Sequence, residues 1–143
     1  MLVTVLGGSA ASPNAGMGCA GLLVRTQAAT FALDLGPGTL PELRRHADFR
    51  RLDAVVVSHM HLDHVLDLLA LRAVAPFDAC DEPGRFAATV DVREYDPAGR
   101  LRIGDATVAF APAVHYLPAW AMRVSSAGGA DLGYTGDTGP AAD

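Results

Sequence analysis

The stretch "SHMHLDHVLDL", residues 58–68, constrains this chain more than any other, because it follows directly on the apolar run "DAVVV". Three of the chain's five histidines fall within six positions there, together with one aspartate. A valine-rich apolar run of this length predicts a buried strand. His59 and His61 leave that strand two residues apart, so both imidazoles project from the same side and can converge on one metal ion.

Asp63 and His64 come next, where the chain is expected to turn into a helix. Their side chains can point to a second ion nearby, with the carboxylate as a hard oxygen ligand and the imidazole as a borderline one. This mixture suits Zn²⁺, with Mn²⁺ or Fe as alternatives. Four ligand-type residues in this order after an apolar strand favour a metal site over a coincidental polar loop.

The bulk properties indicate one globular domain over residues 1–143, since half of the residues are hydrophobic and 19% are charged. The net charge of -5 does not indicate nucleic acid or an anionic membrane as a partner. Cys19 and Cys80 have no metal-ligand spacing and are expected to be free thiols in a reducing cytoplasm, although a disulfide stays open. The N-terminal apolar run is too short for a signal peptide, and no run reaches a membrane-spanning length. We therefore expect a soluble cytoplasmic protein.

The order of apolar runs and turns predicts strands, a helix, a strand, a helix and then further strands, which is a layered α/β or α+β pattern. A buried strand at 2–6 precedes a hairpin of "LLVRT" and "TFALD", and "LDAVVVS" is expected to be a central strand. A helix is expected over 63–75, stopped by Pro76, and "FDACDEPGRFAA" after it reads as irregular. The strands expected after it lie within the stretches 89–95, 101–113, 119–126 and 131–137.

The sequence also predicts a second helix and a glycine-rich loop. A helix is expected to start near Thr39, with Thr39 as its cap, Pro41 in the first turn and Glu42 in capping-box spacing. His46 on this helix is expected to be an exposed polar residue. The stretch "GGSAASPNAGMGCAG" at 7–21 has no ordered phosphate-binding motif, so a flexible loop beside a site is favoured over a phosphate cradle.

The His-x-His-x-Asp-His order resembles the signature of the metallo-β-lactamase superfamily. The resemblance covers nearly the whole chain. "VTVLGGSAASP" looks like the family's first strand and loop, and "FALDLGPGT" resembles its Asp-x-Gly element. "PAVHYLPAWAMRV" and "LGYTGDTGP" match the later histidine and aspartate motifs. The resemblance implies an αββα sandwich. It also implies that Asp34 orients the metal ligands.

Further roles are implied by the same resemblance. His59, His61 and His115 would hold the first ion, Asp63 and His64 the second, and Asp137 would bridge both. Asp63 would also orient the nucleophile. The wording "His-x-x-Pro-Ala" and "Tyr-Thr-Gly-Asp-Thr" resembles the ribonuclease Z and cyclic-nucleotide phosphodiesterase branch. That branch implies a dinuclear zinc hydrolase that attacks phosphodiesters with a metal-bridging hydroxide.

The chain departs from the family pattern in its second half. No histidine follows His115, so the second metal site has three candidate ligands and lacks a fourth, as well as the histidine that such phosphodiesterases can use as general acid. Much of the second half of the sandwich and part of the middle are missing. We expect a piece of a longer chain; the alternative is a minimal form that self-associates. A homodimer is the expected assembly by resemblance.

The expected substrate is a small phosphodiester such as a cyclic nucleotide. The acidic balance and the absence of an RNA-binding arm between residues 65 and 115 favour it over structured RNA. Three alternatives stay open: a ribonuclease Z-like endonuclease, a lactone or sulfate-ester hydrolase, and a non-catalytic metal-binding module. No flavin-binding domain is present in the sequence.

Overall fold

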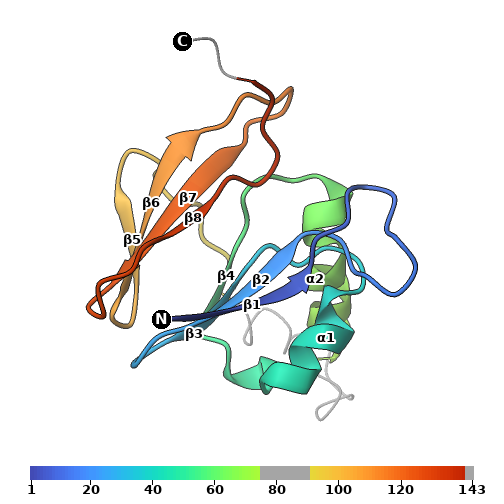
Figure 1. The fold of residues 1–143 in the computed structure, drawn as a ribbon, viewed down its shortest axis with the longest axis horizontal. Coiled ribbons are helices and arrows are strands. Elements are labelled where there is room, and N and C mark those ends of the chain that lie inside the picture. The colour runs from blue at the N-terminus through green and yellow to red at the C-terminus, as the bar shows by residue number, and fades with distance from the viewer. Residues whose placement is uncertain (75–90, 141–143) are drawn as a thin grey trace.

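The computed structural model describes residues 1–74 and 91–140, and these residues form three layers (Figure 1). Two helices cover one face of a first sheet, and a second sheet packs on its other face. The first sheet has the order β1 (Leu2–Gly7), β2 (Gly21–Arg25), β3 (Thr30–Leu33) and β4 (Ala54–Val56). The second has the order β5 (Arg100–Ile103), β6 (Ala106–Pro112), β7 (Trp120–Ser126) and β8 (Leu132–Tyr134). The helices are α1 (Thr39–His46), α2 (Leu62–Val74) and the short 3₁₀ helix η1 (Phe49–Arg51).

Strand β3 is buried on both faces, and this position explains its unbroken apolar sequence. Phe31 and Leu33 point into the core between the two sheets, whereas Ala32 points toward the helices. β2 and β3 pair antiparallel as the predicted hairpin, and β4 pairs parallel to β3. The prediction of a layered fold and of this hairpin is confirmed.

Two apolar cores hold the layers together. The core between the sheets draws on β2, β3 and β4 on one side and on β5, β6 and β7 on the other; its fully buried members include Val24, Phe31, Leu33, Val108 and Val124. The core between the first sheet and the helices is formed by Leu6, Leu23, Ala32, Leu35, Leu40 and Leu43. The first sheet is thus covered on both sides by the described residues.

Two predictions about the first sheet need correction. The run 52–58 is not a central strand: only 54–56 are extended, and β4 is the outermost strand of this sheet within the described residues. The Val57 carbonyl accepts a hydrogen bond from the Tyr95 hydroxyl at 2.9 Å. β1 is only partly buried, because it pairs with β2 on one side in the described part and leaves Val5 66% exposed.

The strand expected at 89–95 is also wrong where the structure describes it. Residues 91–95 have no regular secondary structure. Asp91 accepts hydrogen bonds from the Arg93 side chain two residues on, and Val92 between them is 87% exposed, so this segment has no apolar face to bury. Only Tyr95 is anchored, stacked on Phe110 of β6 with ring centroids 4.1 Å apart.

At the start of α1 the cap is Gly38, not Thr39. Gly38 has a φ of 85°, and no side chain of its own serves the helix. The Thr39 hydroxyl donates instead to the Gly36 carbonyl at 2.6 Å. The Leu40 N–H, which has no partner within α1, donates to the Oδ2 atom of Asp67 in α2 at 2.7 Å. His46 is exposed as predicted.

The remaining predictions divide between those confirmed and those outside the described residues. α2 agrees with the predicted helix up to Val74, although it begins one residue earlier, at Leu62. β6 and β7 lie within the predicted strands, β5 begins at Arg100, one residue before the predicted stretch, and β8 ends at Tyr134. Cys19 is fully buried. Cys80, Pro76 and the stretch 77–88 lie outside the described residues. Among residues 1–74 and 91–140, no helix combines the length and hydropathy that a membrane-spanning segment requires.

Candidate metal centre

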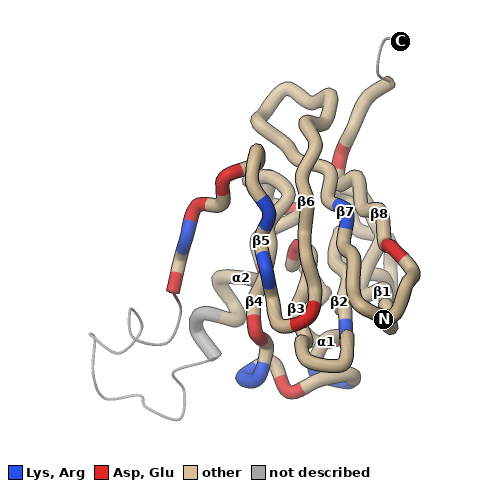
Figure 2. Tube along the Cα trace, turned by 90° about the vertical axis from the view of Figure 1, so that its left-hand side faces the viewer, with Lys and Arg blue, Asp and Glu red and all other residues tan. Residues whose placement is uncertain are grey.

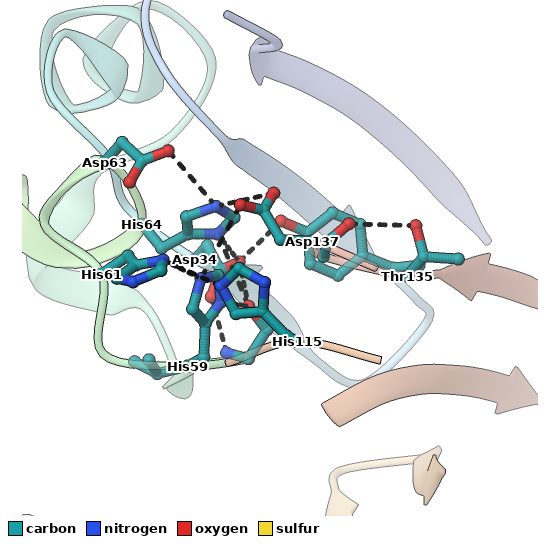
Figure 3. A network of polar contacts seen from close by, with 12 residues as sticks. Asp34, His59, His61, Asp63, His64, His115, Thr135 and Asp137 are labelled. Atoms are coloured by element: carbon teal, nitrogen blue, oxygen red, sulfur yellow. Dashed lines mark hydrogen bonds and ion pairs between the residues drawn. The ribbon is translucent and has the colours of Figure 1, made fainter. Parts of the chain in front are cut away.

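All six side chains predicted as metal ligands lie in one cluster at one end of the two sheets (Figure 3). His59 and His61 lie in the turn between β4 and α2, and Asp63 and His64 begin α2. His115 comes from the loop between β6 and β7, and Asp137 follows β8. Each sheet therefore supplies part of the cluster.

The first group consists of three imidazoles and one carboxylate, with one ligand atom of each within 4.8 Å of the others: His59, His61, His115 and Asp137. The Nδ1 atom of His61 lies 2.9 Å from Nε2 of His59 and 3.0 Å from Nε2 of His115. The nearest Asp137 oxygen is 3.9 Å from His59 Nε2. The three ring nitrogens thus face one common point.

The second group consists of Asp63, His64 and Asp137. The Nε2 atom of His64 lies 3.3 Å from Oδ1 of Asp137 and 3.6 Å from Oδ2 of Asp63. Asp137 belongs to both groups, with Oδ2 toward His59 and Oδ1 toward His64. Its position between them is the one that the resemblance assigned to a bridging carboxylate.

Asp34 lies behind the cluster and organises it. Its carboxylate is fully buried and accepts four hydrogen bonds. Oδ1 accepts from the backbone N–H of Ser58, and Oδ2 accepts from the Ser58 hydroxyl, His64 Nδ1 and the Tyr134 hydroxyl, all at 2.6–2.7 Å. Asp34 is also the one non-glycine residue of the described part with a positive φ, 56°. Such a conformation is costly for a side chain with a Cβ, and it persists where the surroundings demand it.

These contacts orient two of the imidazoles. His64 donates its Nδ1–H to Asp34, which leaves the Nε2 lone pair facing Asp63 and Asp137. The single hydroxyl proton of Ser58 goes to Asp34, so the Ser58 oxygen accepts Nδ1–H of His59 at 3.0 Å. The Nε2 lone pair of His59 then faces the cluster. Partners behind a metal-binding imidazole commonly fix its tautomer in this way.

The electrostatic environment differs between the two groups. Burial lowers the pKa of His59, and the neighbouring His64 and His61 lower it further. For His64 burial also opposes protonation, but the hydrogen bond and charge of Asp34, with Asp137 and Asp63, outweigh it and raise the pKa. Burial and the Asp34 carboxylate raise the pKa of Tyr134 well above its usual range, so its hydroxyl stays a donor.

Close backbone packing holds the loops that carry the ligands. A Cβ at Gly36 would lie 1.8 Å from the Asp63 carbonyl oxygen, so this position needs glycine for the loop after β3 to approach α2. The Leu35 N–H donates to the His64 carbonyl at 2.7 Å. On the other side, the Trp120 N–H donates to the Ser58 carbonyl at 3.1 Å, which ties the His115 loop to the His59 turn.

Sequence reasoning missed Ser58 and Tyr134 as parts of the site. Ser58 had a signal, because a small polar residue follows the apolar run directly before His59. Tyr134 had none beyond its place in the "GYTGD" stretch, because its partner Asp34 is 100 residues away. The glycine-rich loop does lie beside the site: Gly7, Gly8 and Ser9 line a pocket of about 370 Å³ together with the second ligand group.

The donor set fits metal ions better than hydrogen bonds among its members. A neutral imidazole has one N–H, and that of His59 points away to Ser58, so its inward Nε2 cannot donate. His61 Nδ1 can donate to one of its two neighbours at most, which leaves lone pairs facing one another. Nitrogens that share a zinc ion at about 2.0–2.1 Å stand about 3.3 Å apart in a tetrahedron, close to the separations here.

Comparison with known proteins identifies the family. The model of the beta-lactamase superfamily domain matches residues 29–143. The chain belongs to the beta-lactamase superfamily. YhfI of Bacillus subtilis, named a probable metallo-hydrolase, is 26% identical over 157 residues, covering 96% of this chain and 64% of YhfI. A ribonuclease Z of Bradyrhizobium diazoefficiens is 43% identical over 70 residues, covering 48% of this chain and 23% of the enzyme.

Solved structures of this superfamily share the fold. YhfI superposes with a TM-score of 0.79 at 24% identity, over 93% of this chain and 61% of YhfI. The short form of human tRNase Z superposes with a TM-score of 0.70 at 18% identity, over 94% of this chain and 68% of the enzyme. The chain thus spans less than two thirds of the length of the curated relatives described here. The predicted metallo-β-lactamase fold is confirmed.

Proposed function

We propose that this chain carries the metal centre of a dinuclear metal-dependent hydrolase that cleaves small phosphodiesters. The observation that supports this proposal most is the sharing of Asp137 between two ligand groups, because paired metals suit displacement at phosphorus. The names of the relatives agree in kind: one is named a probable metallo-hydrolase and another a ribonuclease Z. Zinc is the metal that the imidazole-rich first group favours.

In this proposal the six side chains divide between two ions. His59, His61 and His115 would hold one ion, Asp63 and His64 the other, and Asp137 both. When bound, the ions would activate a water molecule and neutralise charge on the phosphoryl oxygens. Water adds its oxygen to phosphorus, the bond to one ester oxygen breaks, and the products are a phosphomonoester and an alcohol.

The chain's own residues would prepare this reaction by orientation. Asp34 holds His64 and, through Ser58, His59, with their lone pairs inward. Asp63 is 12% exposed in its side chain and lines the pocket, which supports the proposal that it would orient the attacking water. The pocket beside the second group offers small side chains and glycines, which leave room for one substituent of the phosphodiester.

Charge favours a small substrate over RNA. Figure 2 shows the basic residues of the described part spread over several elements, among them β2, β5 and β7. The arginines whose ion pairs are described contact Glu42, Asp48, Asp91 and Asp131, none of them in the metal centre. A polyanion needs several cationic contacts to bind at physiological salt, whereas a small phosphodiester carries one charge. The 43% identity to a ribonuclease Z keeps RNA as the second candidate.

A panel of substrates tests the proposal. The protein loaded with Zn²⁺ or Mn²⁺ is assayed with bis(4-nitrophenyl) phosphate, cyclic nucleotides, a structured precursor tRNA, a lactone and a sulfate ester. We expect turnover of the small phosphodiesters, with kcat/KM at least 100-fold lower in Asp137→Ala. Faster cleavage of the tRNA would favour the second candidate. Metal binding without turnover of any of these compounds would leave only a metal-binding module.

A further inference from the structure

We propose that the ring of Tyr116 is a stacking platform for a planar group of the substrate, such as a nucleobase, beside the first metal group. This inference rests on the proposed function, because it concerns what the substrate carries next to its phosphate. It adds a residue that determines specificity and that does not belong to the ligand set. The argument depends on exposure, on ring geometry and on the loop that presents the side chain.

Tyr116 is exposed although it lies against the metal centre. Its side chain is 81% exposed, and it is the one aromatic residue among the large exposed apolar residues of the described part. By comparison, Phe31 is fully buried, and Tyr95 stacks on Phe110. With this exposure, much of the ring is open to a further planar group, beyond its contacts with the metal centre.

The ring stands directly beside two of the candidate ligands. Its centroid lies 4.8 Å from the His61 ring and 4.7 Å from the His115 ring, with interplanar angles of 46° and 45°. A phosphate bound at the metal centre would therefore lie within one ring's width of Tyr116. The Tyr116 hydroxyl has no hydrogen-bond partner among residues 1–74 and 91–140, so the protein does not use this side chain as a polar tether.

The loop that carries Tyr116 is held at its base. The Ala113 N–H donates to the Ala119 carbonyl at 2.9 Å, which closes the loop. The Val114 N–H donates to the Thr138 hydroxyl at 3.2 Å, and the Val114 carbonyl accepts from the Gly139 N–H at 2.7 Å. A ring on a loop with fixed ends presents its face with little further ordering, which makes stacking more effective.

The pocket and the ring lie next to different metal groups. The pocket of about 370 Å³ is lined by Asp63, His64 and Asp137 of the second group, whereas Tyr116 contacts His61 and His115 of the first. A phosphodiester has two substituents. One would enter the pocket between the glycines, and the planar one would lie on Tyr116. Stacking of a base on an aromatic side chain tolerates any base, because each has a π face.

Equilibrium binding tests this inference without relying on turnover. Calorimetry on the zinc-loaded protein compares adenosine 5′-monophosphate with ribose 5-phosphate, which has the same phosphate and sugar but no base. We expect the wild-type protein to bind the nucleotide roughly 5- to 100-fold more tightly than the sugar phosphate. Tyr116→Ala should abolish this difference, and Tyr116→Phe should keep it because the ring remains. Val114→Ala, a change of an exposed apolar residue on the same loop, should also keep it.

Three results would overturn the stacking role. The first is an unchanged preference for the nucleotide in Tyr116→Ala. The second is an equal loss for both probes, which would mean that the substitution disturbs the metal centre. The third is no binding of either probe to the wild-type protein. Hydrolysis of bis(4-nitrophenyl) phosphate by the wild-type protein is measured in parallel. Turnover without a base preference would refute the stacking role alone, and a base preference without turnover would refute the proposed function alone.

Discussion

Asp34 combines three features that rarely occur together in one residue: a left-handed backbone, full burial and four hydrogen bonds to its carboxylate. The backbone conformation turns the carboxylate under the cluster at the end of β3. There it fixes His64 directly and His59 through Ser58. Single residues of this kind give the metal centre its orientation, although they do not belong to either ligand group.

Replacing Asp34 by asparagine should weaken metal binding while keeping the shape of the side chain. Asparagine has one acceptor oxygen and an NH₂ group, so the NH₂ must face either the Ser58 backbone N–H or the three donors on Oδ2, and the charge that favours these donors is lost. We expect zinc affinity to fall by about 10- to 100-fold, measured by competition with a chromophoric chelator. Glu94→Gln, the same change of charge at an exposed residue, is the control. Equal affinities of the two variants would contradict the role of Asp34.

Tyr95 predicts a pH effect on stability away from the metal ligands. Burial, with a contribution from the Asp34 carboxylate, raises the pKa of Tyr95 from 10.0 to about 12. Above pH 10 the unfolded chain ionises this phenol while the folded chain resists, so stability present below pH 10 is lost as the pH rises toward about 12. Urea unfolding measures the free energy of unfolding at pH 9 and pH 11. Its decline between these two pH values should be smaller in Tyr95→Phe than in the wild-type protein. Parallel declines would refute this assignment.

At the scale of elements, the N-terminus of α1 depends on α2. Asp67 accepts the Leu40 N–H at 2.7 Å, a capping contact made by a different helix. Local sequence rules placed the cap on Thr39 because its spacing to Glu42 fits a capping box. The partner was 27 residues away, and no local pattern identifies it.

Removal of this contact should destabilise the fold. Asp67→Ala is expected to lower the free energy of unfolding by about 1 kcal/mol, as loss of a helix cap does. Glu42→Ala removes exposed ion pairs with Arg45 and His46 on the same helix and should cost at most about 0.5 kcal/mol. Denaturant unfolding of both metal-free variants gives the comparison. A larger loss in Glu42→Ala would count against the capping role of Asp67.

The elements that sequence alone predicted are those whose signal is local. The hairpin of β2 and β3 and the helix after Asp63 have strong apolar periodicity between clear turns. The stretch 91–95 alternates in the same way, but Asp91 and Arg93 bind each other and Val92 finds no neighbour to cover it. Periodicity measures what a segment could bury, and tertiary contacts decide whether it does.

At the scale of the whole molecule, the metal centre exists only when the two sheets are packed. His59, His61, Asp63 and His64 come from the side of the first sheet, and His115 and Asp137 from the second. The positions of these ligands along the chain could be predicted, because the histidine motif resembles the signature of the family. The contact of Tyr134 with Asp34 could not be predicted, because it arises from the docking of the sheets, whereas Ser58 and Asp34 both follow strands of the first sheet.

Phe31 tests this dependence. It is fully buried between the sheets, so Phe31→Ala is expected to cost about 3–5 kcal/mol of stability. The milder Phe31→Leu should stay folded but bind zinc more weakly, because the sheets carry different ligands. Val92→Ala, at an 87% exposed position, should change stability by less than about 0.5 kcal/mol. Unfolding and chelator competition measure both effects; unchanged zinc affinity in a destabilised Phe31→Leu would separate packing from metal binding.

The most direct measurement is the number of metal ions per chain, by elemental analysis after zinc reconstitution and removal of free metal. The account predicts close to two zinc ions in the wild-type protein, at most one in Asp137→Ala, and an unchanged number in the Glu94→Gln control. One ion or none in the wild-type protein, or two retained in Asp137→Ala, would contradict the central claim that Asp137 joins two metal positions in this chain.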